Sequence, residues 1–229
     1  MIDSSGPMNV TSLAHCSTEI PDTWPYNEGQ MSRAGLVVVL SGPSGVGKDA
    51  VIAGLESDLF PFTRIVTATT RTIRPGEVDG QSYHFLTPEE FTRWRDDGKF
   101  LEWATYGQAY YGTPLESVHQ ALAKGETVLL KIEVQGAAQI RQKLPDAIFI
   151  FLGPGSFEEL AERLHRRGTE STEAFDRRIQ QAREELAQLP NYDYLVINRH
   201  DELGCAIEQV EAIITAERLR VRQRPIRFR

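Results

Sequence analysis

Residues 36–48 read LVVVLSGPSGVGK, an apolar run that leads into a glycine-rich loop ending in lysine. A short apolar run bounded by glycine predicts a buried strand of a parallel sheet. Gly42, Gly47 and Lys48 fit the pattern G-x-x-x-x-G-K, in which backbone N–H groups cradle phosphate at the start of a helix. We therefore predict a nucleotide-phosphate site formed by Gly42, Pro43, Ser44, Gly45, Val46, Gly47, Lys48 and Asp49.

The residue after the loop lysine departs from this pattern. A Ser or Thr hydroxyl normally ligates Mg²⁺ at this position, whereas the chain carries Asp49. A carboxylate can also ligate Mg²⁺, but it brings a negative charge close to the nucleotide phosphates. We expect Asp49 to contact the metal, directly or through water, in a protein that remains active.

Composition and length limit the possible classes of protein. The chain has 229 residues, of which 41% are hydrophobic, so it can form one domain with inserted lobes. Its net charge of −7 argues against general nucleic-acid binding. Two cysteines, Cys16 and Cys205, are too few for a disulfide framework and favour a reducing, cytoplasmic setting. No apolar run reaches the roughly 20 residues of a membrane span.

The two ends differ from the body of the chain. Residues 1–33 are rich in small and polar residues without periodicity, so we expect disorder, or a translation start at Met31. Residues 218–229 form an Arg-rich tail. It is either a solvated helix end or a segment that binds RNA or a partner protein. Its arginines are Arg218, Arg220, Arg222, Arg224, Arg227 and Arg229.

Strand and helix patterns alternate along the body, which predicts an α/β fold with a mainly parallel sheet flanked by helices. Thr87, Thr113 and Ser156 each precede a helix-starting pattern and are predicted N-caps. The predicted strands are 36–40, 64–68, 127–133, 146–152 and 194–198. The predicted helices are 49–59, 88–97, 114–125, 157–168, 172–189 and 201–222.

The stretch between residues 68 and 113 is less regular and mixes polar with aromatic residues. Such a composition is typical of a pocket lining rather than of a core. Arg71 and Arg74 flank a Thr-Ile pair within it, and guanidinium groups bind phosphate through two parallel hydrogen bonds. We therefore expect a second substrate site here.

Five segments together resemble the guanylate kinase family: 42–48, 67–85, 100–113, 132–136 and 163–171. The resemblance extends in consistent order over residues 35–217 and implies a P-loop nucleoside monophosphate kinase fold. It also implies ATP-dependent phosphorylation of GMP, and of dGMP, to the diphosphate. On this basis we expect a kinase-like domain over 34–217. Its parts are a core (34–66, 114–153, 190–217), a GMP-binding lobe (67–113) and a helical lid (154–189).

The resemblance also implies roles for the residues of the second site. Those expected to hold the GMP phosphate are Arg71, Arg74, Tyr83 and Tyr111. Those expected to bind guanine are Thr67, Glu102, Thr113 and Glu133. The chemistry of guanine agrees with this, because its Watson–Crick edge carries N–H donors that suit an acceptor-only carboxylate. Adenine has an unprotonated ring nitrogen in the same place.

Arginines of the predicted lid complete the expected set. Arg163 and Arg167 share one helix face, and Arg178 lies in the next helix. The resemblance implies that they close over the phosphates, and that Mg²⁺, Lys48 and Arg71 assist in-line transfer with them. No general base is needed, because the GMP phosphate is already an anionic nucleophile. As a second departure, Lys131 stands where the family usually carries an acidic residue.

Two other functions compete with this one. A catalytically inactive guanylate-kinase-like interaction module would lose its phosphate-binding residues, but Lys48, Arg71 and Arg74 are present. A related phosphokinase acting on a sugar bisphosphate would lose the guanine pocket, but Glu102 and Glu133 are present. We therefore expect an enzyme with ATP and GMP as its partners, with no membrane association, as a monomer or homodimer.

Overall fold

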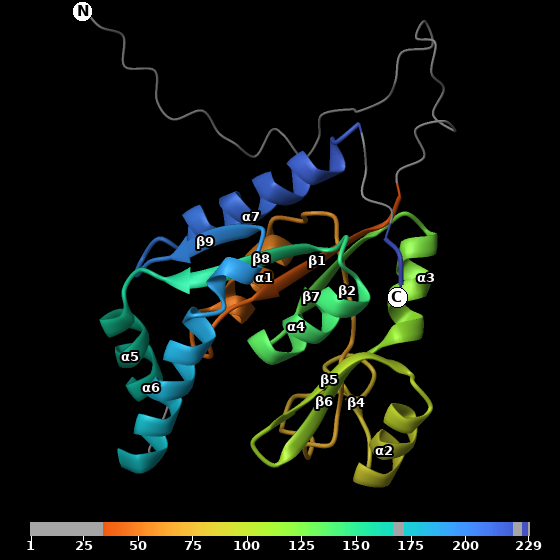
Figure 1. Cartoon of the computed structure of the whole chain (residues 1–229), viewed down its shortest axis with the longest axis horizontal. Coiled ribbons are helices and arrows are strands. Elements are labelled where there is room, and N and C mark those ends of the chain that lie inside the picture. Colours follow the sequence, from red (N-terminus) through yellow and green to blue (C-terminus); the bar gives the residue numbers. More distant parts are fainter. Residues whose placement is uncertain (1–33, 167–171, 222–225, 229) are drawn as a thin grey trace, which may run out of the picture. The chain divides into compact units, whose positions relative to one another are not determined.

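The computed structural model describes residues 34–166, 172–221 and 226–228. Within these ranges the chain forms a five-stranded sheet in the order β2-β7-β1-β8-β9 and a four-stranded sheet in the order β4-β3-β6-β5 (Figure 1). The larger sheet consists of β1 (Leu36–Ser41), β2 (Thr63–Arg64), β7 (Thr127–Lys131), β8 (Ile148–Pro154) and β9 (Tyr194–Asn198). The smaller sheet consists of β3 (Ala68–Thr69), β4 (His84–Phe85), β5 (Phe100–Tyr106) and β6 (Ala109–Pro114). The helices are α1 (Lys48–Ser57), α2 (Pro88–Asp96), α3 (Leu115–Ala123), α4 (Val134–Lys143), α5 (Phe157–Arg166), α6 (Thr172–Leu186), α7 (Leu203–Arg218) and a short 3₁₀ helix (Leu189–Asn191).

Strand β1 is the centre of the larger sheet and is buried along its whole length. Its neighbours β7 and β8 both run parallel to it, and β2 and β9 continue the parallel arrangement outward. Val38 and Leu40 pack with α1 and α7 on one face, whereas Val37 and Val39 pack with α3 and α4 on the other. The prediction of a parallel sheet flanked by helices is therefore confirmed.

The smaller sheet, in the lower part of Figure 1, fills the stretch that the sequence leaves irregular. Strands β5 and β6 form an antiparallel hairpin that turns at Gly107, which has a φ of 62°. A small core of Ala68, Phe91 and Phe100 joins this sheet to α2. The predicted capping box of α2 is confirmed, because Thr87 accepts from the backbone of Glu90 and the Glu90 side chain accepts from the backbone of Thr87.

Several predicted helices extend beyond the observed ones; α3 ends at Ala123 rather than near residue 125, and α6 ends at Leu186 rather than at 189. The helix predicted to reach residue 59 ends at Ser57, and Leu59 is 87% exposed with a φ of 55°, a backbone conformation that cannot continue a helix. The helix predicted for 201–222 is α7, Leu203–Arg218. Leu219 and Val221, which fall within the predicted bounds but beyond α7, are 58% and 83% exposed.

The predicted N-cap at Thr113 is wrong. The cap residue of α3 is Pro114, with no side-chain hydrogen bond, and Thr113 still belongs to β6. The Thr113 hydroxyl instead donates to Glu102 Oε1 at 2.6 Å, across the β5–β6 hairpin. A tertiary hydrogen bond therefore replaces the local one that the sequence pattern predicts.

The Arg-rich segment begins inside the fold. Arg218 belongs to α7 and donates to the Thr127 hydroxyl at 2.5 Å, and Arg220 pairs with Glu217 at 3.1 Å. Farther along the chain, the centroid of the Phe228 ring lies 4.1 Å from that of the His119 ring on α3. Arg218 and Arg220 thus contact the body of the protein. Arg222, Arg224 and Arg229, together with residues 1–33, lie outside the described residues.

The order of strands predicts where a ligand binds. The chain crosses from one side of β1 to the other between β7 and β8, and ligands of open α/β sheets bind at such a switch point, beyond the carboxyl ends of the strands. The loops after β1 and β7 meet at this edge.

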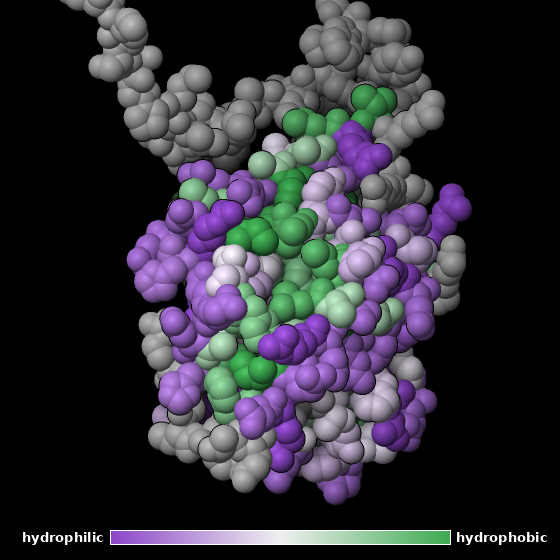
Figure 2. Space-filling view, turned by 60° about the vertical axis from the view of Figure 1, so that its left-hand side comes forward, coloured by the Kyte–Doolittle hydropathy of each residue, from purple (hydrophilic) through white to green (hydrophobic). Residues whose placement is uncertain are grey.

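Figure 2 shows a band of apolar side chains flanked by hydrophilic ones on the face turned forward in that view. No described helix is both long and apolar enough to span a membrane.

Candidate functional site

The conformation of the loop after β1 requires glycine at position 47. Gly47 has a φ of 106°, and a Cβ added to it would lie 2.3 Å from Asn198 Nδ2. That amide donates to Val46 O at 2.8 Å and so ties the loop to the end of β9. A side chain at residue 47 would both strain the backbone and break this contact. The loop therefore leads directly into α1, as the sequence predicts.

The Lys48 ammonium group is buried against this loop. It donates to Gly42 O at 2.6 Å and Pro43 O at 3.2 Å, and it pairs with Glu133 Oε2 at 3.2 Å. Its side chain is only 7% exposed. Lys48 thus brings a positive charge to the phosphate loop and links the loop to the end of β7.

The two departures from the expected pattern contact each other. Lys131 Nζ donates to Asp49 Oδ1 at 2.6 Å. Desolvation raises the pKa of Asp49, but the hydrogen bond and charge of Lys131 outweigh it and hold this pKa below its usual value. The ends of α1 and β7 are therefore joined by two ion pairs of opposite polarity, Lys48–Glu133 and Asp49–Lys131.

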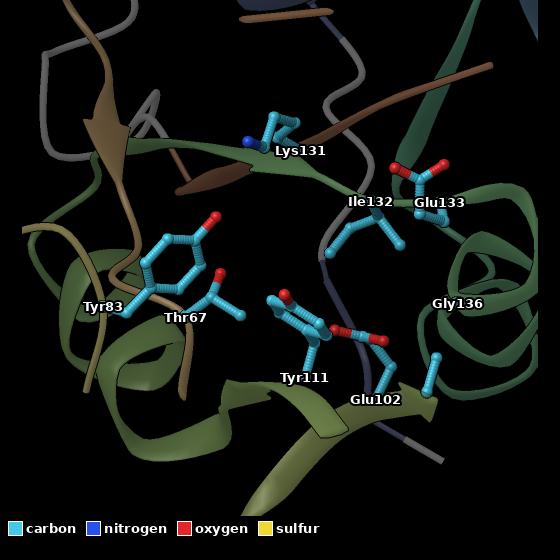
Figure 3. Close-up of a pocket in the computed structure, with 9 residues that line it drawn as sticks. Thr67, Tyr83, Glu102, Tyr111, Lys131, Ile132, Glu133 and Gly136 are labelled. Atoms are coloured by element: carbon cyan, nitrogen blue, oxygen red, sulfur yellow. The ribbon is translucent and has the colours of Figure 1, made fainter. Parts of the chain in front are cut away.

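A pocket of about 210 Å³ lies between the end of β7 and the smaller sheet. Figure 3 shows Glu102 and Tyr111 on the side of the smaller sheet, opposite Lys131, Ile132 and Glu133. The remaining lining residues are Thr67, Tyr83, Ala104 and Gly136. Three of the four residues predicted to bind guanine line this pocket. Thr113, the fourth, does not line it and contacts Glu102 instead.

Glu102 is the most perturbed carboxyl group of the pocket. Its side chain is buried, and the neutral hydroxyl of Thr113 is its side-chain donor. Burial raises its pKa to about 6, although the hydrogen bonds from Thr113 and the charge of Lys143 oppose the shift. A carboxylate held in this way has one oxygen committed to Thr113 and one available to a ligand's donors.

Space for this carboxylate depends on a glycine that the sequence reasoning missed. A Cβ added to Gly136, on α4, would lie 2.6 Å from Glu102 Oε2 and 2.6 Å from Ile132 Cγ2. Gly136 lies inside the stretch IEVQG that carries part of the family resemblance. Its spatial neighbour on β5 is 34 residues away in sequence, so no local signal indicates the contact.

Arg71 is held by a residue that was also missed. Its guanidinium donates to Glu77 through two nitrogens, at 2.7 and 3.0 Å, and it lies over the Tyr83 ring at 5.4 Å. Hydrogen bonds to Glu77 raise its pKa, and Tyr111 adds to the effect. Glu77 also accepts from the backbone N–H of Arg74 at 2.7 Å. Arg71 therefore lies beside Tyr83 and Tyr111, two residues that line the pocket, whereas Arg74 is linked to this group through its backbone contact with Glu77.

The predicted lid arginines are described in part. Arg163 on α5 donates to Val46 O and to Asn198 O, each at 3.1 Å, and it pairs with Glu159. Arg163 therefore packs directly against the phosphate loop. Arg178 lies on α6, and Arg167 falls outside the described residues.

A buried carboxylate of α6 also reaches the phosphate loop. Glu185 Oε2 accepts from the backbone N–H of Ser44 at 3.3 Å, and its other oxygen accepts from Gln181 at 2.9 Å. Burial raises the pKa of Glu185, and the nearby Glu133 adds to the shift. This residue was not predicted, because its loop contact spans 141 residues.

The described residues hold no cluster of three or more His, Cys, Asp or Glu side chains arranged to bind a metal ion. Mg²⁺ in nucleotide sites typically takes one or two protein oxygens and completes its shell with phosphates and water. The Asp49 carboxylate has one oxygen on Lys131 and is 76% exposed, so its donor chemistry suits that arrangement.

A central parallel strand, a glycine loop and a helix that begins with the loop lysine together define a P-loop nucleotide-binding protein. A family model described as guanylate kinase matches residues 34–217. The chain therefore belongs to the guanylate kinase family.

Individual relatives agree with this assignment. The guanylate kinase of Desulfitobacterium hafniense is 45% identical over 85% of this chain and 96% of the relative. That of Streptococcus thermophilus is 50% identical over 83% of this chain and 91% of the relative. The crystal structure of guanylate kinase from Anaplasma phagocytophilum superposes with a TM-score of 0.65 at 28% identity, covering 82% of this chain and 88% of that one.

Proposed function

We propose that this protein is an ATP:GMP phosphotransferase that converts GMP to GDP. The observation that carries the proposal is the buried Glu102 carboxylate, which faces the end of β7 across a pocket next to the phosphate loop. Family membership supports the reaction, and the chemistry of this one group supports the choice of base.

Glu102 provides the guanine selectivity. Its Oε2 can accept from the N–H groups of the guanine Watson–Crick edge, whereas the ring nitrogen of adenine would face it with a lone pair. A mismatch that leaves a buried polar group unpaired can cost about 10⁴-fold in specificity. We assign Thr113 to positioning, because its hydroxyl hydrogen is already donated to Glu102. Thr67 and Glu133 line the same pocket and remain predicted contacts of the base.

The acceptor phosphate is assigned to the cluster around Arg71. Arg71 and Arg74 supply positive charge, and Tyr83 and Tyr111 supply hydroxyl groups from rings that meet edge to face at 6.0 Å. Glu77 fixes the loop that carries both arginines. The phosphate would therefore meet donors whose positions are already set, which lowers the entropy cost of binding.

The donor ATP is assigned to the loop of residues 42–49, with Lys48 as its buried cation. In-line transfer requires that the charge on the equatorial oxygens be offset. Lys48, Arg71, Arg163, Arg167 and Arg178 are the protein groups that we assign to this role. Mg²⁺ would add positive charge to the phosphates, and Asp49 is the protein group that we propose to hold it. Helices α5 and α6 would exclude water by closing over the loop.

A coupled assay tests the function. Purified protein is given ATP with GMP, with AMP or with a sugar bisphosphate in separate reactions, while release of ADP is followed. We expect release with GMP and at least about 10³-fold less with AMP. Absence of GMP-dependent ADP release from folded protein would support the inactive interaction module, and release with a sugar bisphosphate alone would support the related phosphokinase.

The exposed thiol of Cys205 is consistent with the reducing, cytoplasmic setting that we propose.

A further inference from the structure

The Asp49–Lys131 ion pair joins the two positions at which this chain departs from the pattern of its family. The ammonium and carboxylate are 2.6 Å apart, with side chains 28% and 76% exposed. Asp49 alone would be unexpected near nucleotide phosphates because of its charge, and Lys131 stands where the family resemblance implies an acidic residue. Their contact shows that the two departures form one unit.

The pair lies between the two substrate sites. Asp49 is the second residue of α1 and directly follows Lys48. Lys131 is the last residue of β7 and lines the pocket assigned to GMP. In Figure 3 the Lys131 ammonium points away from Glu133, which pairs with Lys48 instead. The two cations of this region are thus held by different carboxylates.

Charge determines what each partner would do alone. An uncompensated Asp49 carboxylate would repel the anionic phosphates that the loop binds, because like charges within a few ångströms disfavour each other strongly in a partly desolvated site. Pairing with Lys131 offsets that charge. The hydrogen bond from Lys131 to Asp49 Oδ1 also restricts the orientation of the carboxylate.

We propose that Lys131 is a positioning residue for the bound nucleotide, which acts by holding the Asp49 carboxylate at the start of α1 and offsetting its charge. The pair together takes the place of the neutral hydroxyl that this position normally carries. This inference rests on the proposed function, since it assigns ATP to the loop. We therefore predict that substitution of Lys131 weakens ATP binding only while residue 49 is Asp.

Three variants of the full chain test this: Lys131→Met, Asp49→Ser and the double variant. The dissociation constant of ATP is measured by titration calorimetry without GMP, with and without Mg²⁺. We expect Lys131→Met to weaken ATP binding by about tenfold without Mg²⁺. The loss should be smaller with Mg²⁺, because the released carboxylate can then contact the metal. Adding Lys131→Met to Asp49→Ser should change ATP binding little relative to Asp49→Ser itself, because the carboxylate on which Lys131 acts is then absent.

Lys124→Met is the matched control. Lys124 is 70% exposed at the end of α3 and 4.0 Å from its partner Glu126, so its loss changes net charge equally at a distance from the loop. It should leave ATP binding unchanged. Thermal unfolding of each variant establishes that it is folded.

Two results would overturn the proposal. Equal losses from Lys131→Met in the wild type and in the Asp49→Ser variant would mean that Lys131 acts on the phosphates directly. No loss beyond that of Lys124→Met would mean that the pair is an ordinary surface contact. The wild-type assay with ATP and GMP is run alongside, so that absence of GMP turnover counts against the proposed function and not against the pair.

Discussion

The backbone of Gly136 approaches Glu102 so closely that an added Cβ would stand 2.6 Å from Oε2 of that carboxylate. Glycine within a helix costs about 1 kcal/mol relative to alanine, so its presence in α4 requires a reason. The reason is that the helix passes directly behind the carboxylate assigned to guanine. Glycine at position 136 lowers the stability of α4 but leaves space for the Glu102 carboxylate.

Gly136→Ala should therefore impair GMP binding. The new methyl group must displace Glu102 or Ile132, and overpacking of a buried site costs about 1–3 kcal/mol, so we expect the dissociation constant of GMP to rise at least about tenfold. ATP binding should not change. Gly204→Ala is the control, because a Cβ there meets nothing within 4 Å and α7 should gain helix propensity. Unchanged GMP affinity in Gly136→Ala would show that Glu102 can move freely.

GMP binding should weaken in acid because guanine is assigned to the ionised form of Glu102. The pKa of this group is about 6, so below that pH the dissociation constant should rise about tenfold per unit. The second ionisation of the GMP phosphate also lies near pH 6, so the comparison is made with Glu102→Gln, which retains only the phosphate titration. Identical pH profiles for wild type and Glu102→Gln would contradict the assignment.

The same shift makes Glu102 costly to the fold at neutral pH. Its pKa is 4.5 in a free chain and about 6 in the fold, so its stabilising effect is complete below 4.5 and is lost as pH rises through 6. Relative to Glu102→Gln, the wild type should lose about 2 kcal/mol of unfolding free energy between pH 4 and pH 8. Urea unfolding of both proteins at the two pH values measures this. A constant difference between them would mean that the carboxyl group is not desolvated.

Thr113 should control the ionisation of Glu102. Thr113→Val keeps the shape of this buried residue but removes the 2.6 Å hydrogen bond, so the pKa of Glu102 should rise further. At pH 7 we expect GMP binding to weaken by about tenfold, with partial recovery at pH 8.5. Thr113→Ser, which keeps the hydroxyl, should bind GMP as the wild type does. A loss in Thr113→Val that is independent of pH would indicate a direct contact between the hydroxyl and guanine.

Glu185 should compete with ATP for the phosphate loop. It accepts from the Ser44 N–H and places a second carboxylate near Lys48, so Glu185→Gln should strengthen ATP binding by about tenfold. Glu184→Gln is the matched control, since Glu184 lies on the same helix with an exposed side chain. Calorimetric titration with ATP measures both. Weaker binding in Glu185→Gln would mean that the carboxylate organises the loop rather than competing for it.

The sequence predicts those features whose cause is local. The strand before the phosphate loop, the loop itself and the Thr87 capping box are confirmed, because each depends on neighbours within a few residues. The Thr113 cap is wrong for the complementary reason: its hydroxyl finds a stronger acceptor on the adjacent strand. The Lys131–Asp49 and Ser44–Glu185 contacts span 82 and 141 residues, and no local pattern indicates them. The sequence analysis identified most of the chemical groups at the site, but their pairing follows from the fold.

The register of β1 and β7 pairs Leu40 with Lys131, the residue at which β7 begins to line the pocket. A strand register changes only in whole residues, and a one-residue slip turns every side chain to the opposite face. The β1–β7 ladder therefore sets the spacing between the phosphate loop and the Lys131 side of the pocket in whole-residue steps. Glu102 on β5 and Tyr111 on β6 form the opposite side of the pocket, so variation aimed at altered base selectivity should be sought in these two strands.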